Sequence, residues 1–147
     1  MKCAVTFITE HPALMKIVFD TNCLLKILPK KSKYRCLWDT FLDGGFDLCF
    51  TTEILSEYEE VFSRFYSPKT AEFMVGVLLK SQNTIQTTPY FRWNLISADP
   101  DDNKFVDCAL NVGADYLVTS DHHFNILKSL KFPPIKVIDI ETFISLF

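Results

Sequence analysis

Two aspartates follow apolar segments that are far apart in the chain. Asp20 ends the apolar segment at residues 16–20, and Asp121 directly follows "DYLVTS" at residues 115–120. If both segments are strands of one parallel sheet, the two carboxylates lie at the same edge, where ligands bind in α/β proteins. Each aspartate alone has a simpler interpretation, because Asp is a favoured helix N-cap and a helix is expected after both strands.

Asp102 is more informative, because helical spacing places it on the apolar face of its own helix. Phe105, Val106 and Ala109 lie three, four and seven positions later and share that face. Asp107 is expected on the opposite, solvated side. A carboxylate aimed at the core needs partners or a cation. The alternative is that Asp102 accepts hydrogen bonds only from free backbone N–H groups of the first helical turn.

A fourth acidic residue is expected from the helix predicted at residues 52–66. Apolar residues recur there at helical spacing, and Glu60 falls opposite to them, which predicts that it is exposed. Glu57 and Glu59 fall on the two borders of the apolar stripe. Periodicity alone leaves the choice between these two open.

Four carboxylates from four separate segments can therefore meet at one edge of the predicted sheet. No residue in these motifs obviously neutralises them, and like charges that lie close together repel unless a cation bridges them. Oxygen ligands favour Mg²⁺ or Mn²⁺. Such ions can activate a water molecule and stabilise the leaving oxygen of a phosphodiester.

A basic run, "KILPKKSKYR", follows the Asp20 segment and is a candidate patch for contacts with a phosphate backbone. It supplies five of the fifteen basic residues: Lys26, Lys30, Lys31, Lys33 and Arg35. A local basic patch would offset the net charge of −3, which gives no global attraction to nucleic acid. The alternative is a solvated corner between two helices. The histidines, including His122 and His123, are expected to be surface residues rather than ligands.

The bulk composition is that of an ordinary globular protein. The 147 residues are 48% hydrophobic and 22% charged, and fourteen phenylalanines predict an aromatic core. Five cysteines without a C-x-x-C pair indicate free thiols in a reducing cytoplasm. No stretch approaches the roughly 20 apolar residues of a membrane span. Residues 1–14 are interpreted as an arm or an alternative start, and residues 15–147 as a single domain.

The segments that must position these residues alternate between strand and helix patterns. Helices are predicted at residues 23–28, 32–43, 52–66, 68–80, 99–113 and 121–130, and at the end of the chain, with Thr52 as the cap of the third. Strands are predicted at 16–20, 46–51, 115–120 and 136–140, and somewhere within 84–96. This alternation predicts an α/β fold, with a mostly parallel sheet and helices on both faces.

The ordered set of motifs resembles the PIN-domain nucleases. The matching stretches are "KIVFDTN" at 16–22, "EILSEYEEV" at 53–61, and "DPDDNKFVDCALNVGADYLVTSD" at 99–121 with the following "HHF". The resemblance implies a three-layer α/β/α sandwich with a parallel sheet of about five strands. It also implies cleavage of single-stranded RNA with Mg²⁺ or Mn²⁺. Many such proteins are toxins of toxin–antitoxin pairs, which implies a cognate antitoxin as partner and frequent homodimers.

The resemblance also assigns the candidate site residues. The acidic positions of the family fall on Asp20, Glu57, Asp102 and Asp121, and its polar residue after the first acid falls on Asn22. Two positions depart from the family pattern. Relatives often carry another acid where this chain has Asn103, and Asp or Asn where it has His123.

Three other functions compete with a toxin nuclease. A PIN fold can bind RNA or a protein without cutting, and a PIN nuclease can process RNA as a housekeeping enzyme. A phosphotransferase of the haloacid-dehalogenase type would use an Asp nucleophile after the first strand. Such enzymes usually have a second Asp two residues later, where this chain has Asn22.

Overall fold

Five short strands form one all-parallel sheet in the order β3-β2-β1-β4-β5. The structure is a computed structural model, and it describes residues 14–147. The strands are β1 (Lys16–Phe19), β2 (Asp47–Phe50), β3 (Thr84–Gln86), β4 (Tyr116–Val118) and β5 (Val137–Ile138). The predicted five-stranded parallel α/β fold is confirmed.

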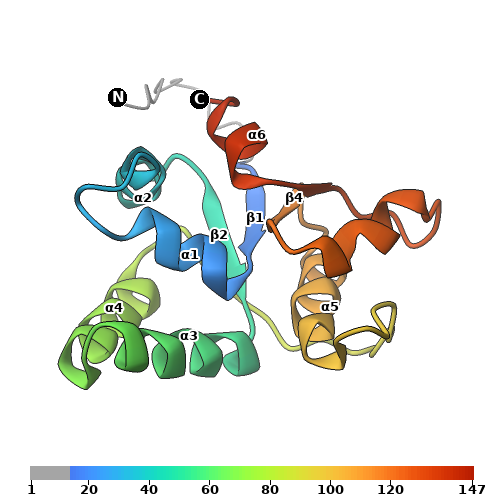
Figure 1. Ribbon diagram of the computed structural model, residues 1–147, viewed down its shortest axis with the longest axis horizontal. Helices are drawn as coiled ribbons and strands as arrows, with labels where there is room; N and C mark the ends of the chain where they lie inside the picture. Colours follow the sequence, from blue (N-terminus) through green and yellow to red (C-terminus); the bar gives the residue numbers. More distant parts are fainter. Residues whose placement is uncertain (1–13) are drawn as a thin grey trace.

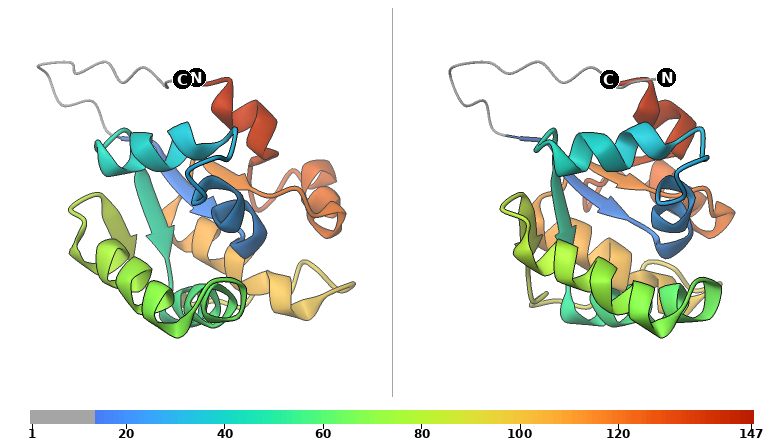
Figure 2. Two further views of the ribbon diagram at one scale, coloured as in Figure 1. Left: turned by 60° about the vertical axis from the view of Figure 1, so that its left-hand side comes forward. Right: turned by 90° about the vertical axis from the view of Figure 1, so that its left-hand side faces the viewer.

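Six α-helices and two 3₁₀ helices connect and cover these strands within residues 14–147. The α-helices are α1 (Thr21–Ile27), α2 (Arg35–Leu42), α3 (Thr52–Phe65), α4 (Pro68–Lys80), α5 (Asn103–Val112) and α6 (Ile140–Ile144). The 3₁₀ helices are η1 (Pro100–Asp102) and η2 (His122–Ser129). In Figure 1, α5 lies on one side of β1 and β2, and α1 and α2 lie on the other. Figure 2 shows α3 and α4 packed side by side.

An aromatic cluster joins the sheet to the helices on the face opposite α5. The ring centroid of Phe46 lies 5.9 Å from that of Phe19 in β1 and 5.4 Å from that of Phe143 in α6. It also lies 5.8 Å from that of Phe41 in α2. These rings are buried, so the prediction of an aromatic core is confirmed. The cluster holds β1 in place immediately before Asp20.

Side-chain caps and one glycine set the helix boundaries. Ser67 caps α4, with Pro68 in its first turn, as predicted. The cap of α3 is Thr51 rather than Thr52, because the Thr51 hydroxyl accepts the Ile54 N–H. Gly113 ends α5 with a φ of 64°, a backbone conformation that favours glycine.

Several predicted elements are shorter or of another type in the structure. The third strand covers only three residues of the predicted window, and residues 87–99 form an irregular loop. The segment after Asp121 is a 3₁₀ helix. The last strand ends at Ile138, because Asp139 accepts the Thr142 N–H and starts α6.

The four cysteines within residues 14–147 are buried, and none of them forms a disulfide there. Cys3 and nearly all of the predicted N-terminal arm lie outside residues 14–147. Within those residues, the helices fall short of the length and apolar character that a membrane span requires.

The aromatic cluster predicts a large cost for truncating Phe46. Phe46→Ala should lower the free energy of unfolding by about 3–5 kcal/mol, because it removes a ring that is fully buried among four others. Phe73→Ala is the matched control, because this ring on α4 is 69% exposed, and it should cost under about 1 kcal/mol. Urea denaturation measures both, and equal costs would contradict the assignment of Phe46 to the core.

Candidate functional site

Asp20 is a buried carboxylate at the carboxyl end of β1, with both oxygens engaged. Oδ1 accepts the Cys23 N–H at 2.8 Å and so caps α1. Oδ2 accepts a hydrogen bond from the Thr119 hydroxyl. Burial raises the pKa of Asp20, these hydrogen bonds lower it, and the charge of Asp121 raises it. The predicted cap is therefore present, and the carboxylate also lies near a second acid.

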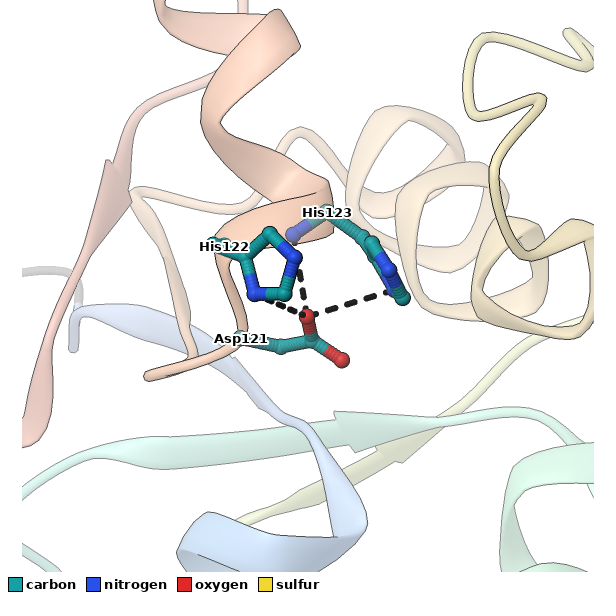
Figure 3. A group of neighbouring side chains, drawn as sticks. All are labelled: Asp121, His122 and His123. Carbon is teal, nitrogen blue, oxygen red and sulfur yellow. Dashed lines mark hydrogen bonds and ion pairs between the residues drawn. The ribbon is translucent and has the colours of Figure 1, made fainter.

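Asp121 lies at the same edge, because β4 pairs in parallel with β1. Its Oδ1 accepts the His123 N–H at 2.9 Å and caps η2, which confirms the other predicted cap. The same oxygen lies 3.3 Å from Nδ1 of His123 and 3.8 Å from Nδ1 of His122. Figure 3 shows this oxygen between the two imidazole rings, while the other oxygen of Asp121 points away from them.

Asp102 points inward from the N-terminal end of α5, as its helical position predicts. Its side chain makes no capping hydrogen bond, so the alternative that it binds only first-turn N–H groups is wrong. Oδ2 is buried without a hydrogen-bond partner and lies 3.5 Å from Nδ1 of His123. Burial raises the pKa of Asp102 to about 6, and the charges of Asp99 and Asp121 add to the effect.

His123 lies between two acids, which differs from the surface position expected for both histidines. Its Nδ1 is buried without a hydrogen-bond partner and within 3.5 Å of carboxylate oxygens of Asp102 and Asp121. His122 is exposed, as expected. The sequence pattern did not reveal this position, because it predicted that both histidines lie on the surface. The one available signal was that His123 departs from the pattern that the resemblance implies.

Glu57 faces the site from α3, whereas Glu59 and Glu60 are exposed. Its Oε1 lies 2.7 Å from Nζ of Lys104, and its Oε2 accepts a hydrogen bond from the Thr21 hydroxyl. Glu57, and not Glu59, therefore faces Lys104 and Thr21.

Lys104 is the neutralising residue that sequence reasoning did not find. Its side chain is only 6% exposed, and its Nζ lies 2.9 Å from Oδ1 of Asp101 as well as against Glu57. Burial lowers the pKa of Lys104, but the two carboxylates outweigh burial and raise it. The one available signal was its position three residues after Asp101, which allows an ion pair within a helical turn.

The predicted acids do not all gather into one tight cluster. Among residues 14–147, two groups bring three possible metal-ligating side chains within 4.8 Å of one another: Asp121–His122–His123 and Asp99–Asp102–His123. Asp20 and Glu57 belong to neither group. Asp20 is instead linked to Asp121 through Thr119, whose hydroxyl also accepts the Asp121 N–H.

The predicted basic run lies beside α1, and its members differ in whether they lie within ion-pair distance of an acid of this chain. Lys26, Lys30 and Lys31 are exposed. Lys33 lies 3.0 Å from Glu141, and Arg35 lies 3.4 Å from Asp39. The first three are therefore better placed than the last two to meet an external phosphate. Asn22, on the first turn of α1, is also exposed.

Asp107 is buried, which contradicts the expectation that it faces solvent. Its Oδ1 accepts the Trp93 N–H at 3.1 Å, because the loop at residues 87–99 covers that side of α5. Asn103 also anchors this loop: its side chain accepts the Ile96 N–H at 2.9 Å and donates to the Ile96 carbonyl at 2.8 Å. The position where relatives often have an acid therefore holds the loop in this chain.

The all-parallel sheet with carboxylates at its carboxyl edge shows an α/β protein with a candidate ligand site at that edge. A model of the PIN domain matches residues 16–123, which is more than half of the chain. The chain therefore belongs to the PIN-domain family, which confirms the resemblance seen in the sequence. No curated protein matches it.

Several solved structures are similar to the chain in fold. VapBC2 from Rickettsia felis, bound to a promoter DNA fragment, has a TM-score of 0.60 at 14% identity and covers 85% of this chain and 98% of its own. VapBC-1 from nontypeable Haemophilus influenzae has a TM-score of 0.60 at 13% identity, with coverages of 86% and 99%. Mycobacterium tuberculosis VapC20, described as a sarcin-ricin loop cleaving toxin, has a TM-score of 0.57 at 10% identity, with coverages of 80% and 99%.

The raised pKa of Asp102 predicts a pH-dependent gain in stability for Asp102→Asn. When folding raises the pKa of a carboxyl group, the folded state holds the proton more tightly than the unfolded state. The free energy of unfolding therefore falls as pH rises from about 4 to about 6, where Asp102 ionises. In EDTA, Asp102→Asn should be about 1–3 kcal/mol more stable than the wild type at pH 7.5. The gain should vanish near pH 4, where both proteins are neutral at this position.

Urea denaturation at the two pH values measures this difference. Glu60→Gln, which neutralises an exposed glutamate, should show no comparable gain. A gain of the same size at both pH values would contradict the assignment to Asp102.

Asn103→Asp tests the loop anchor. An aspartate cannot donate to the carbonyls of Ile96 and Pro100, which Asn103 Nδ2 contacts at 2.8 and 3.2 Å. The substitution should lower the free energy of unfolding by about 1–3 kcal/mol. Asn125→Asp, at an exposed position in η2, is the matched control. Thermal unfolding compares the two, and unchanged stability of Asn103→Asp would argue against an anchoring role.

Proposed function

We propose that the chain is a metal-dependent endoribonuclease that hydrolyses phosphodiester bonds of single-stranded RNA. The observation that carries this proposal is the buried Oδ2 of Asp102, which lacks a hydrogen-bond partner and lies beside Asp121 and His123. A bound cation would compensate the charge of this oxygen, because a buried carboxylate without a hydrogen-bond partner is costly. Membership of the PIN-domain family supports the same proposal.

The donor set fits Mg²⁺ or Mn²⁺. Asp20 and Asp121 offer hard carboxylate oxygens at one sheet edge, Asp102 offers a buried oxygen beside His123, and Glu57 lies against Lys104. These four acids are the residues we propose as metal ligands and catalytic groups. When bound, the ion supplies a more nucleophilic water and compensates charge on the leaving oxygen.

The protein's own contribution is orientation and proton transfer. Thr119 and Cys23 hold the Asp20 carboxylate in one direction, and Lys104 and Thr21 do the same for Glu57. Groups aligned before the substrate arrives need no reorganisation during the reaction. An acidic residue of this set accepts the proton of the attacking water.

The RNA strand is proposed to approach along the basic run. Lys26, Lys30 and Lys31 contact phosphates, with Asn22 nearest to the carboxylates. Lys33 and Arg35 contribute less, because each already lies within ion-pair distance of an acid of this chain.

The biological role proposed is that of a toxin in a toxin–antitoxin pair. The similar structures include VapBC complexes and a toxin described as cleaving the sarcin-ricin loop, and the chain spans nearly their full length. Their similarity concerns the fold, so a cognate antitoxin and a homodimer are proposed partners. Exposed Phe65 and Tyr66 provide apolar surface for protein contacts.

Replacement of the site aspartates tests the nuclease proposal. Asp20→Asn and Asp102→Asn should each reduce cleavage of single-stranded RNA by roughly 100-fold or more, because each removes a charge that holds the ion. Glu60→Gln is the control and should cleave like the wild type. Cleavage of a labelled RNA in Mg²⁺ or Mn²⁺ is followed on a denaturing gel, and EDTA should abolish it.

Full cleavage by Asp20→Asn would refute the assigned site. A wild-type protein that binds no divalent metal by calorimetry and cuts no RNA would favour the non-catalytic binding module. Growth arrest on expression, relieved by Asp102→Asn, would separate a toxin from a housekeeping RNA-processing enzyme.

A further inference from the structure

The loop at residues 87–99 carries an exposed aromatic cluster that the proposed active site does not use. Tyr90 and Phe91 are 88% and 73% exposed, and Phe132, from the segment before β5, is 75% exposed. Trp93 lies between Phe91 and Phe132, with ring centroids 6.3 and 6.1 Å away. Single exposed apolar residues are ordinary, but a contiguous group of them marks a binding surface.

Polar side chains of α5 hold this loop at three points. Asn103, Asp107 and Asn111 lie four residues apart and therefore on one face of the helix. Asn103 binds both backbone groups of Ile96, Asp107 accepts the Trp93 N–H, and Asn111 donates to the carbonyl of residue 88 at 3.3 Å. The aromatic rings are thus presented on an anchored loop, which lowers the ordering cost of binding.

A cavity of about 310 Å³ lies between the loop, the start of α3 and the start of α5. Its uncharged and basic lining from the loop and from the start of α3 comprises Thr51, Thr52, Thr87, Thr88, Arg92 and Asn94. Its other wall includes Asp101 and Lys104, and Lys104 pairs with Glu57. Three acidic residues line the cavity. Asp101 pairs with Lys104, Asp107 accepts the Trp93 N–H, and Glu53 is the third.

We propose that this cavity and the aromatic cluster form a track for single-stranded RNA on one side of the scissile bond. The cavity takes the sugar and phosphate of a neighbouring nucleotide, and Tyr90, Phe91 and Phe132 stack with the bases that follow. The inference rests on the proposed function, because it places the scissile phosphate at the carboxylates.

The chemistry of the surface favours RNA over a protein partner. Unpaired bases offer flat faces to aromatic rings, and the chain places Arg92 between the aromatic residues of the loop and Lys131 beside Phe132. Hydroxyl and amide groups line the cavity beside the loop, and they match ribose hydroxyls and phosphate oxygens. A purely apolar protein contact would leave these polar groups without partners.

RNA binding by a double variant tests the track. Tyr90→Ala combined with Phe91→Ala should weaken binding of a short fluorescent single-stranded RNA about tenfold or more, measured by anisotropy in EDTA. Phe73→Ala, which removes a comparably exposed ring on α4, should leave the affinity unchanged. Both changes are at exposed side chains, and equal thermal unfolding of all proteins confirms that the fold is intact.

The outcomes separate this inference from the nuclease proposal. Cleavage by the double variant with raised KM and unchanged kcat supports the track, because stacking acts equally on ground and transition states. RNA affinity and KM equal to those of the wild type overturn the track and leave the nuclease standing. A changed oligomeric state in sedimentation with unaltered RNA affinity also overturns it, in favour of a protein interface. Weakened RNA binding without any cleavage by the wild type supports the track and refutes the nuclease.

Discussion

Parallel pairing of β1 with β4 places Asp20 and Asp121 at one edge of the sheet, where each caps the helix that follows its strand. Thr119 links the two, because its hydroxyl donates to the Asp20 carboxylate and accepts the Asp121 N–H. These hydrogen bonds therefore orient the Asp20 and Asp121 side chains. The remaining parts of the site, from α3, η1 and α5, are arranged around this pair.

The balance of charge at this edge is uneven. Lys104 compensates Glu57 and Asp101, so that side of the site holds a buried ion pair. Asp102 has no such partner, and its nearest nitrogen belongs to His123, which it shares with Asp121. Uncompensated negative charge is thus concentrated at Asp102 and Asp121, which is where a cation would gain most by binding.

Helix α5 contributes side chains to the site and to the neighbouring loop from more than one of its faces. Its N-terminal end carries Asp102 and Lys104, whereas Asn103, Asp107 and Asn111 hold the loop at residues 87–99. The helix therefore fixes the loop relative to the carboxylates. A substrate that contacts both would meet surfaces already at a set separation, which reduces the entropy lost on binding.

Much of the fold could be predicted, because local patterns report local structure. Alternating apolar segments and capping residues indicated the element order and the parallel sheet. Some predictions failed because a local cap shifted a boundary, and others failed because another part of the chain intervened. The third strand stops after Gln86, and the irregular loop that follows covers Asp107, which the helical period alone assigned to solvent.

The sequence by itself determined which carboxylates end strands or begin helices, and so which acids reach the sheet edge. Asp20 and Asp121 follow from strand ends, and Asp102 follows from the period of its helix. Only the tertiary structure decided how their charges are compensated. Lys104 meets Glu57, and His123 meets Asp102, across segments that no sequence period relates. The reason is physical: periodicity reports the face of one element, whereas an ion pair depends on how two elements pack.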